Sequence, residues 1–164
     1  CLLVAKYAAM RPFGLTALRL AIGAVFIAHG GQKLFGLWGG PGLAGTTAYF
    51  ATLGLQPAYP LAILASGTEF IGGILLILGW GTRWVALALA IDMGVAIWKV
   101  HYLNGFFMNW TGTPGRGHGI EFALVLAAAL ICLMLNGPGA LSFDEWRNQS
   151  AEAEARGRAR ARKV

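Results

Sequence analysis

The stretch FGLTALRLAIGAVFIAHGGQKLF, from Phe13 to Phe35, decides how the rest of the chain is interpreted. A helix of about 20 apolar residues crosses the hydrocarbon core of a bilayer, and this stretch is long and apolar enough to do so. It nevertheless carries Arg19, His29 and Lys33. Charged and titratable side chains are costly inside hydrocarbon, so they face other helices or a wet cavity. This span therefore needs partner helices with complementary polar groups.

The composition and three further apolar runs favour a membrane protein over a soluble protein with an unusually apolar core. Hydrophobic residues make up 57% of the 164 residues and charged residues only 12%, whereas about a quarter of a soluble domain is charged. We predict an all-α protein, a four-transmembrane-helix bundle within a domain over residues 1–144, with a basic cytoplasmic tail over 145–164. The spans are expected at about 13–35, 61–78, 84–103 and 120–136.

The connecting segments add three expectations. Pro12 is typical of a helix start, because its missing N–H costs nothing there. A short interfacial helix is expected over 46–53. The tail has helical propensity but too little apolar surface to fold alone, so we expect it to be disordered. Small residues four apart allow helices in lipid to approach closely; they recur at Ala17/Ala21, Ala24/Ala28, Ala86/Ala90/Gly94 and Ala123/Ala127.

The basic residues beside the spans predict the orientation, since they are enriched on the cytoplasmic side. With four spans, both termini lie on the same side as Arg83. That side collects nine basic residues, against three on the other side, Lys33, Lys99 and Arg116. We therefore expect both termini to be cytoplasmic in a multi-pass protein of a bacterial-type inner (plasma) membrane. The basic tail would face lipid headgroups rather than nucleic acid.

The two cysteines, Cys1 and Cys132, form no CxxC motif. Both would lie at the reducing side of the membrane, so we expect free thiols without a redox role. A mature lipoprotein also begins with Cys, but lipidation of Cys1 would place the N-terminus outside, against the charge pattern.

Titratable residues gather in the outer half of the predicted bundle. At 1.5 Å per residue, His29 lies roughly 10 Å from the outer boundary, Glu69 roughly 13 Å and Asp92 roughly 16 Å, with Glu121 within about 6 Å. We expect Glu69 and His29 to be neighbours in the interior, with Asp92 or Glu121 close to the same cavity and with either His29 or Lys33 compensating the charge of Glu69. The ligand-binding or proton-relay candidates are His29, Lys33, Glu69, Asp92 and Glu121.

The chemistry of this set leaves alternatives open. Buried polar pairs can simply fix the packing of a bundle, although apolar side chains would pack as well without the desolvation cost. The sequence has no HxxxH or HExxH motif, so we expect no metal site. Proton relay, or hydrogen bonding to a quinone headgroup, needs only titratable groups beside an apolar cavity. No nucleotide-binding loop, nucleophile motif or catalytic group can be identified, so whether the chain is an enzyme stays open.

Four motifs in order resemble the DoxX family. They are Gly23 to Gly36 with the pattern GxxFxxHGxxKLFG, the run from Glu69 to Gly73 that leads to Gly79 and Arg83, the Glu121 that opens the last span, and the closing segment 137–144, GPGALSFD. The resemblance covers residues 13–144. It implies a small four-helix inner-membrane protein, with His29, Lys33, Glu69, Arg83 and Glu121 at motif positions.

Relatives in that family include the small membrane subunit of thiosulfate:quinone oxidoreductase and a membrane partner of superoxide dismutase and a sulfurtransferase. The resemblance thus implies a redox-associated protein that binds a quinone or similar small molecule, with no covalently bound cofactor. The alternative is a non-catalytic accessory subunit that packs against a larger membrane electron-transfer complex. Its partners would be the lipid bilayer and other membrane subunits or a soluble redox protein, and no nucleic acid. A transporter is the third choice, because four spans are few and no inverted repeat is visible.

Overall fold

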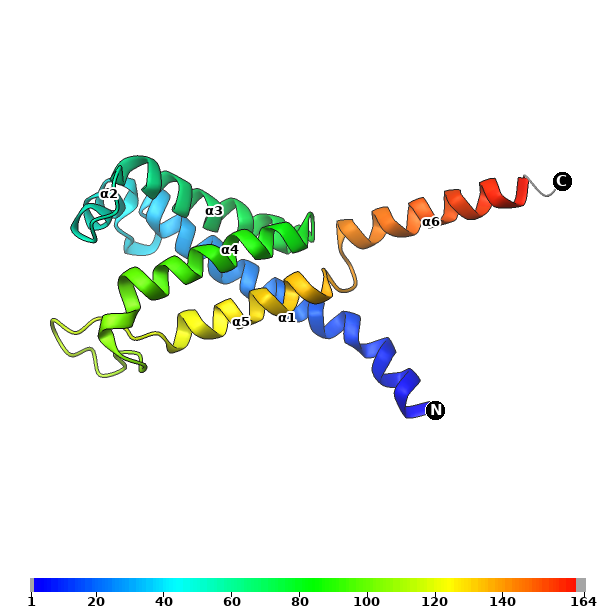
Figure 1. The fold of residues 1–164 in the computed structure, drawn as a ribbon, viewed down its shortest axis with the longest axis horizontal. Coiled ribbons are helices and arrows are strands. Elements are labelled where there is room, and N and C mark those ends of the chain that lie inside the picture. The colour runs from blue at the N-terminus through cyan, green and yellow to red at the C-terminus, as the bar shows by residue number, and fades with distance from the viewer. Residues whose placement is uncertain (1, 162–164) are drawn as a thin grey trace.

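The computed structural model describes residues 2–161, and these residues are helical with no strand. Four helices form the bundle: α1 (Leu2–Phe35), α3 (Ala58–Leu78), α4 (Thr82–Ala96) and α5 (Glu121–Asn136) (Figure 1). The short helix α2 (Gly42–Thr52) and the loop 105–120 lie together at one end, which we call the α2 end. At the other end, the α6 end, the helix α6 (Phe143–Ala161) and the first turns of α1 extend away from the bundle.

Three helical segments are long and apolar enough to cross a membrane: Met10–Phe35, Ala58–Leu78 and Thr82–Asn104. The third combines α4 with a π-helical turn, η2 (Ile97–His101), and a 3-10 turn, η3 (Tyr102–Asn104). A further short 3-10 turn, η1 (Leu37–Gly39), follows α1. The fourth predicted span corresponds to α5, which is apolar but has only 16 residues.

Two expectations about the early segments have different outcomes. The short helix after the first span is confirmed as α2, which begins four residues earlier than expected. The prediction that a helix starts at Pro12 is wrong, because α1 continues through this residue. The carbonyl of Pro12 accepts bonds from the Thr16 hydroxyl (2.9 Å) and the backbone N–H of Ala140 (3.0 Å). The segment after α5 therefore packs against α1 where proline interrupts the helical bonding pattern.

Glycines bring α1 and α3 into the most extensive helix contact of the bundle. A Cβ at Gly30 would lie 2.4 Å from the backbone nitrogen of Phe70, and one at Gly73 would lie 2.7 Å from that of Ile27. Only glycine permits this approach of the two backbones. The expected contact through Ala17, Ala21 and Ala24 is wrong, because these side chains are exposed.

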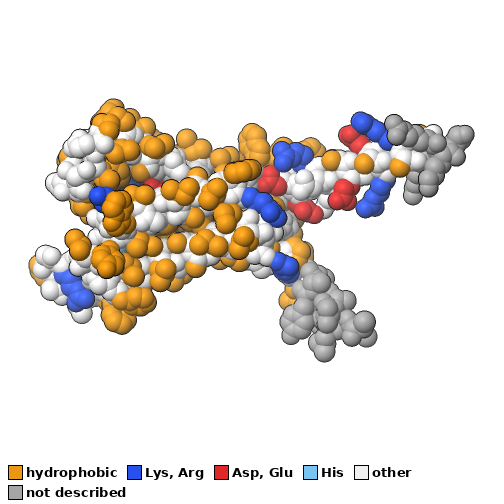
Figure 2. Space-filling view, viewed as in Figure 1, with side chains coloured by type: hydrophobic (Ala, Val, Ile, Leu, Met, Phe, Trp, Pro, Cys, Tyr) orange, Lys and Arg blue, Asp and Glu red, His pale blue; other side chains and the backbone are white. Residues whose placement is uncertain are grey.

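Of the small residues of the later spans, Ala86 and Ala123 are buried in the core between α4 and α5 as predicted, whereas Gly94 is exposed with nothing packed on it. Around them lies the hydrophobic core, whose fully buried members include Leu76, Leu89 and Leu130. Many large hydrophobic side chains are also exposed on the outside of the bundle, and Figure 2 shows hydrophobic side chains along the whole length of one face. Exposed tryptophans lie near both ends: Trp38, Trp98 and Trp110 at the α2 end, and Trp80, Trp84 and Trp146 at the α6 end. An apolar belt between aromatic rims suits a bilayer.

The C-terminal segment corrects the expectation of a disordered tail. It forms α6, an exposed helix with ion pairs between Glu152 and Arg156 (3.4 Å) and between Glu154 and Arg158 (3.7 Å). Acidic residues in its first turn and i,i+4 pairs along an alanine-rich sequence favour a helix without tertiary packing. Residues 162–164 lie outside the described part of the chain.

Asp144 attaches the start of α6 to the bundle. Its two carboxylate oxygens accept the backbone N–H groups of Gly81 and Thr82, each at 2.9 Å. These are free N–H groups at the start of α4, where the helix dipole also favours a negative charge. Beside this contact, the ring of Phe143 lies 5.6 Å from that of Trp80.

Candidate functional site

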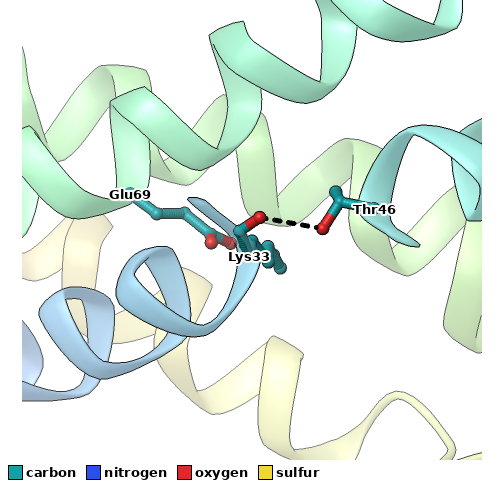
Figure 3. Close-up of polar contacts among 3 residues, drawn as sticks. All are labelled: Lys33, Thr46 and Glu69. Carbon is teal, nitrogen blue, oxygen red and sulfur yellow. Dashed lines mark hydrogen bonds and ion pairs between the residues drawn. The ribbon is translucent and has the colours of Figure 1, made fainter. Parts of the chain in front are cut away.

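Glu69 is the centre of the polar site. It lies on the buried stripe of α3, and its side chain is only 2% exposed. The ammonium of Lys33, near the end of α1, lies 2.5 Å from Oε1 of Glu69 (Figure 3). Because a buried carboxylate without a partner is strongly unfavourable, this ion pair accounts for the presence of Glu69 inside the bundle. The prediction that Lys33 compensates the charge of Glu69 is confirmed.

Asp92 contributes a second carboxyl group from α4. Leu89, one turn before Asp92, packs on Gly72, one turn after Glu69, so the two helices bring Asp92 to the level of Glu69, where the charges of Glu69 and Lys33 act on it. We call Lys33, Glu69 and Asp92 the Glu69 cluster. It joins one residue from each of α1, α3 and α4, and the depth argument for Asp92 is confirmed.

The helix α2 covers the end of α1 that carries Lys33. The hydroxyl of Thr46, a buried residue of α2, lies 3.1 Å from the backbone oxygen of Lys33, to which it donates a hydrogen bond (Figure 3). The same hydroxyl lies 2.8 Å from the carbonyl oxygen of Gly42. This hydrogen bond holds the end of α1 that carries Lys33 against α2. Lys33 itself is 31% exposed, so it links the buried Glu69 to the surface.

His29 corrects the expectation of an interior histidine. Its side chain is exposed, and its ring lies 6.4 Å from that of Phe122 on α5. The neighbouring Gly30 occupies the direction that faces α3, and one residue along a helix turns the side chain by about 100°. His29 remains within electrostatic range of Lys33 and Glu69. It therefore borders the Glu69 cluster from the outside.

Glu121 is not part of the cluster and organises the loop 105–120 instead. Its Oε1 accepts the backbone N–H of Met108 at 2.7 Å and the indole N–H of Trp110 at 3.1 Å. His118 lies in the same loop, where its Nδ1 accepts the backbone N–H of Asn109 (3.2 Å). The expectation that Glu121 shares the cavity of Glu69 has no support in these contacts. Within residues 2–161, no three side chains of His, Cys, Asp or Glu gather as metal ligands would.

The motif residue Arg83 is exposed, whereas Arg19, which we had assigned no role, is fully buried. Arg19 donates to four backbone carbonyls: Leu76 (2.6 Å), Ile77 (2.7 Å), Pro138 (3.0 Å) and Leu141 (3.0 Å). Its planar guanidinium can reach several acceptors at once, which suits this arrangement. It thus ties α1 to the end of α3 and to the segment after α5.

One sequence signal could have located this site. Glycine and proline interrupt regular bonding in the segment 137–139 and leave carbonyls free to accept from a buried arginine. Of the two cysteines, Cys132 is a half-buried free thiol close to Asn136, and Cys1 lies outside the described residues.

Comparisons with known proteins agree with this fold. The DoxX family model matches residues 14–102. The inner membrane protein YphA of Escherichia coli is 33% identical over 141 residues, which cover 84% of this chain and 93% of YphA. The membrane protein Rv3486 of Mycobacterium tuberculosis is 32% identical, with 87% and 86% covered, and the candidate oxidoreductase CatD of Bacillus subtilis is 30% identical, with 80% and 84% covered.

No solved structure matches the chain significantly. The family model nevertheless spans more than half of the sequence, and the relatives match along most of their own length. Lys33 and Glu69, which form the buried ion pair between α1 and α3, both fall inside the matched region. This chain is a member of the DoxX family of bacterial inner-membrane proteins.

Proposed function

We propose that this DoxX protein is redox-associated and binds a quinone or a similar small molecule at the surface beside Lys33 and His29. The observation that carries the proposal is the Glu69 cluster, in which a partly exposed lysine lies beside the buried carboxylate of Glu69 and the half-buried carboxyl group of Asp92. A purely structural ion pair needs one acid and one base. Here a second acid and an exposed imidazole lie at the same place.

The donors suit a ligand that carries carbonyl oxygens. A lysine ammonium has three N–H donors, and the contact to Glu69 uses one of them. The imidazole of His29 offers a further polar group on the same surface. Aromatic side chains lie nearby, with the rings of Phe35 and Phe70 in edge contact at 5.2 Å and that of Phe122 beside His29. A planar apolar ring entering from the lipid would find both kinds of contact there.

The proposal includes the orientation and the number of spans. With α5 as the fourth span, the α6 end carries most of the basic residues and would be cytoplasmic. The Glu69 cluster would then lie in the outer half of the bilayer. The relative CatD is named a candidate oxidoreductase, which agrees with a redox role for this chain.

The test is a titration of the protein in lipid nanodiscs with a short-chain quinone, followed by tryptophan fluorescence. We expect His29→Phe to weaken binding about tenfold, which corresponds to about 1.4 kcal/mol. The double variant Lys33→Met/Glu69→Gln, which removes the donor together with its buried partner, should weaken it at least as much. Lys99→Met is the matched control, because Lys99 lies at the same end but packs over the Trp98 ring at 4.2 Å. Equal affinity in all these proteins would refute the proposed site.

The second candidate is a non-catalytic accessory subunit of a larger membrane complex. Two observations favour it: the exposed face of Ala17, Ala21 and Ala24 on α1, and the projection of α6 away from the bundle (Figure 1). Small residues let another helix approach closely in lipid. In this case Ala21→Leu should release the partner in native mass spectrometry of gently extracted membranes. Ala88→Leu, at an exposed alanine of α4, is the control that should retain it.

A further inference from the structure

The Glu69 cluster contains a buried oxygen without a hydrogen-bond donor. Oε1 of Glu69 accepts from Lys33, but Oε2 has no partner among the described residues. Ser66, one turn earlier on the same buried stripe of α3, has an unpartnered hydroxyl and is fully buried. An unsatisfied buried acceptor costs about 1–3 kcal/mol, and more when it is charged. If both acids of the cluster were ionised, no hydrogen-bond donor would be available for Oε2 of Glu69.

The Asp92 carboxyl group of α4 lies at the level of Glu69, because Leu89, one turn before Asp92, packs on Gly72, one turn after Glu69. The two acids are therefore close enough to act on each other. Two ionised carboxylates offer acceptors only, so they cannot bond to each other. One proton changes this, because a protonated carboxyl group donates while an ionised one accepts. The contact between Asp92 and Glu69 is therefore satisfied when the pair carries a single proton.

The balance of charges also predicts one proton on the two acids. Glu69 of α3 and Asp92 of α4 face each other, and Lys33 and His29 of α1 face both of them. The covering helix α2 contributes no charged residue, and Glu121 of α5 is bound to its own loop. One lysine thus faces two acids, of which Glu69 is almost completely buried and Asp92 is half-buried. With one proton on the pair the three residues are neutral together, and without it they hold an uncompensated buried charge.

We propose that Glu69 and Asp92 share one proton, and that Lys33, Glu69 and Asp92 form a neutral proton-binding site between α1, α3 and α4. This inference concerns the site of the proposed function but does not depend on a quinone. Release of the proton leaves one excess negative charge, and uptake restores neutrality, without electron transfer. Because Lys33 is the member that reaches the surface, a ligand at the surface would contact the ammonium, with the proton held one group behind it.

The experiment is infrared spectroscopy of the protein in nanodiscs at neutral pH, in H2O and D2O, where protonated carboxyl groups give a separate C=O stretch. The remaining acids, Glu121, Asp144, Glu145, Glu152 and Glu154, are hydrogen-bonded or lie on the exposed α6. We expect one band, which shifts in D2O, and the same band in the control Glu121→Gln.

Variants of the three cluster residues test whether the two acids share the proton. Asp92→Asn and Glu69→Gln should each remove the band, because either leaves one ionised acid paired with Lys33. Both keep the cluster neutral and should therefore fold. Lys33→Met should roughly double the band, since both acids are then protonated.

Absence of the band from the unmodified protein would overturn the proposal. A band that survives Glu69→Gln would also overturn it, because the proton would then belong to Asp92 alone. A failed quinone titration leaves this result untouched, so the two proposals can fail separately.

Discussion

Replacement of Arg19 by methionine is the most direct test of how the α6 end is held together. Methionine fills similar space without donors. The Leu76 carbonyl would keep the N–H of Gly79 at 3.1 Å, but the carbonyls of Ile77, Pro138 and Leu141 would lose the guanidinium donor that binds them. At about 1–3 kcal/mol for each unsatisfied carbonyl, the loss is about 3–9 kcal/mol. Removal of a buried cation returns several kcal/mol of desolvation, so we expect a net cost of about 3–5 kcal/mol.

The assay is thermal unfolding in nanodiscs together with hydrogen exchange of the segment 137–142. For a chain of this size, each kcal/mol corresponds to about 2–4 °C, so Tm should fall by roughly 6–20 °C and the segment should exchange faster. Arg83→Met is the matched control, because Arg83 is exposed at the same end and its side chain makes no hydrogen bond within residues 2–161. If Arg19→Met unfolds at the same temperature as this control, the carbonyl contacts do not stabilise the bundle and the reasoning is wrong.

Three further predictions concern packing, capping and topology. Gly30→Ala should lower stability by about 1–3 kcal/mol in thermal unfolding, because its Cβ would meet the backbone of α3, whereas Gly67→Ala, with nothing within 4 Å, should raise stability slightly. Asp144→Ala should cost about 1–2 kcal/mol and accelerate amide exchange at the start of α4, since two N–H groups lose their acceptor; unchanged exchange there would contradict the cap. Cysteines introduced at Ser150 and Thr113 should react with an impermeant thiol reagent from the cytoplasmic and the outer side respectively, and labelling of Ser150→Cys from outside would reverse the orientation.

The sequence predicted the helices of the bundle and the meeting of Lys33 and Glu69 for a simple reason. Length, hydropathy and rise per residue determine how far along its helix each residue lies, and residues at matching depth can meet. Asp92 was found by the same argument. Depth says nothing about rotation, however, so His29 was expected inside although its neighbour Gly30 faces α3.

The remaining differences arise where side chains bind backbone groups. Glu121 lies at a predictable height, but its partners are N–H groups of a loop whose conformation no periodicity encodes. Arg19 counted only among the charged residues of the first span that need partners, and its partners are backbone carbonyls, whose positions the residue types do not encode. The helix α6 has no packed face, so a criterion based on apolar surface missed a helix that local ion pairs favour.

The contacts of Arg19 also impose an order on the biogenesis of the protein. Arg19 leaves the ribosome within the first span, where an arginine without partners is costly in the hydrocarbon. Two of its four acceptors, the carbonyls of Pro138 and Leu141, are synthesised more than a hundred residues later. Until then the nascent chain carries an arginine that only the end of α3 can accept. The α6 end therefore closes late in synthesis. In a chain truncated before residue 138, Arg19 of the first span would lack two of its carbonyl acceptors, and we expect quality-control proteases to degrade such a chain.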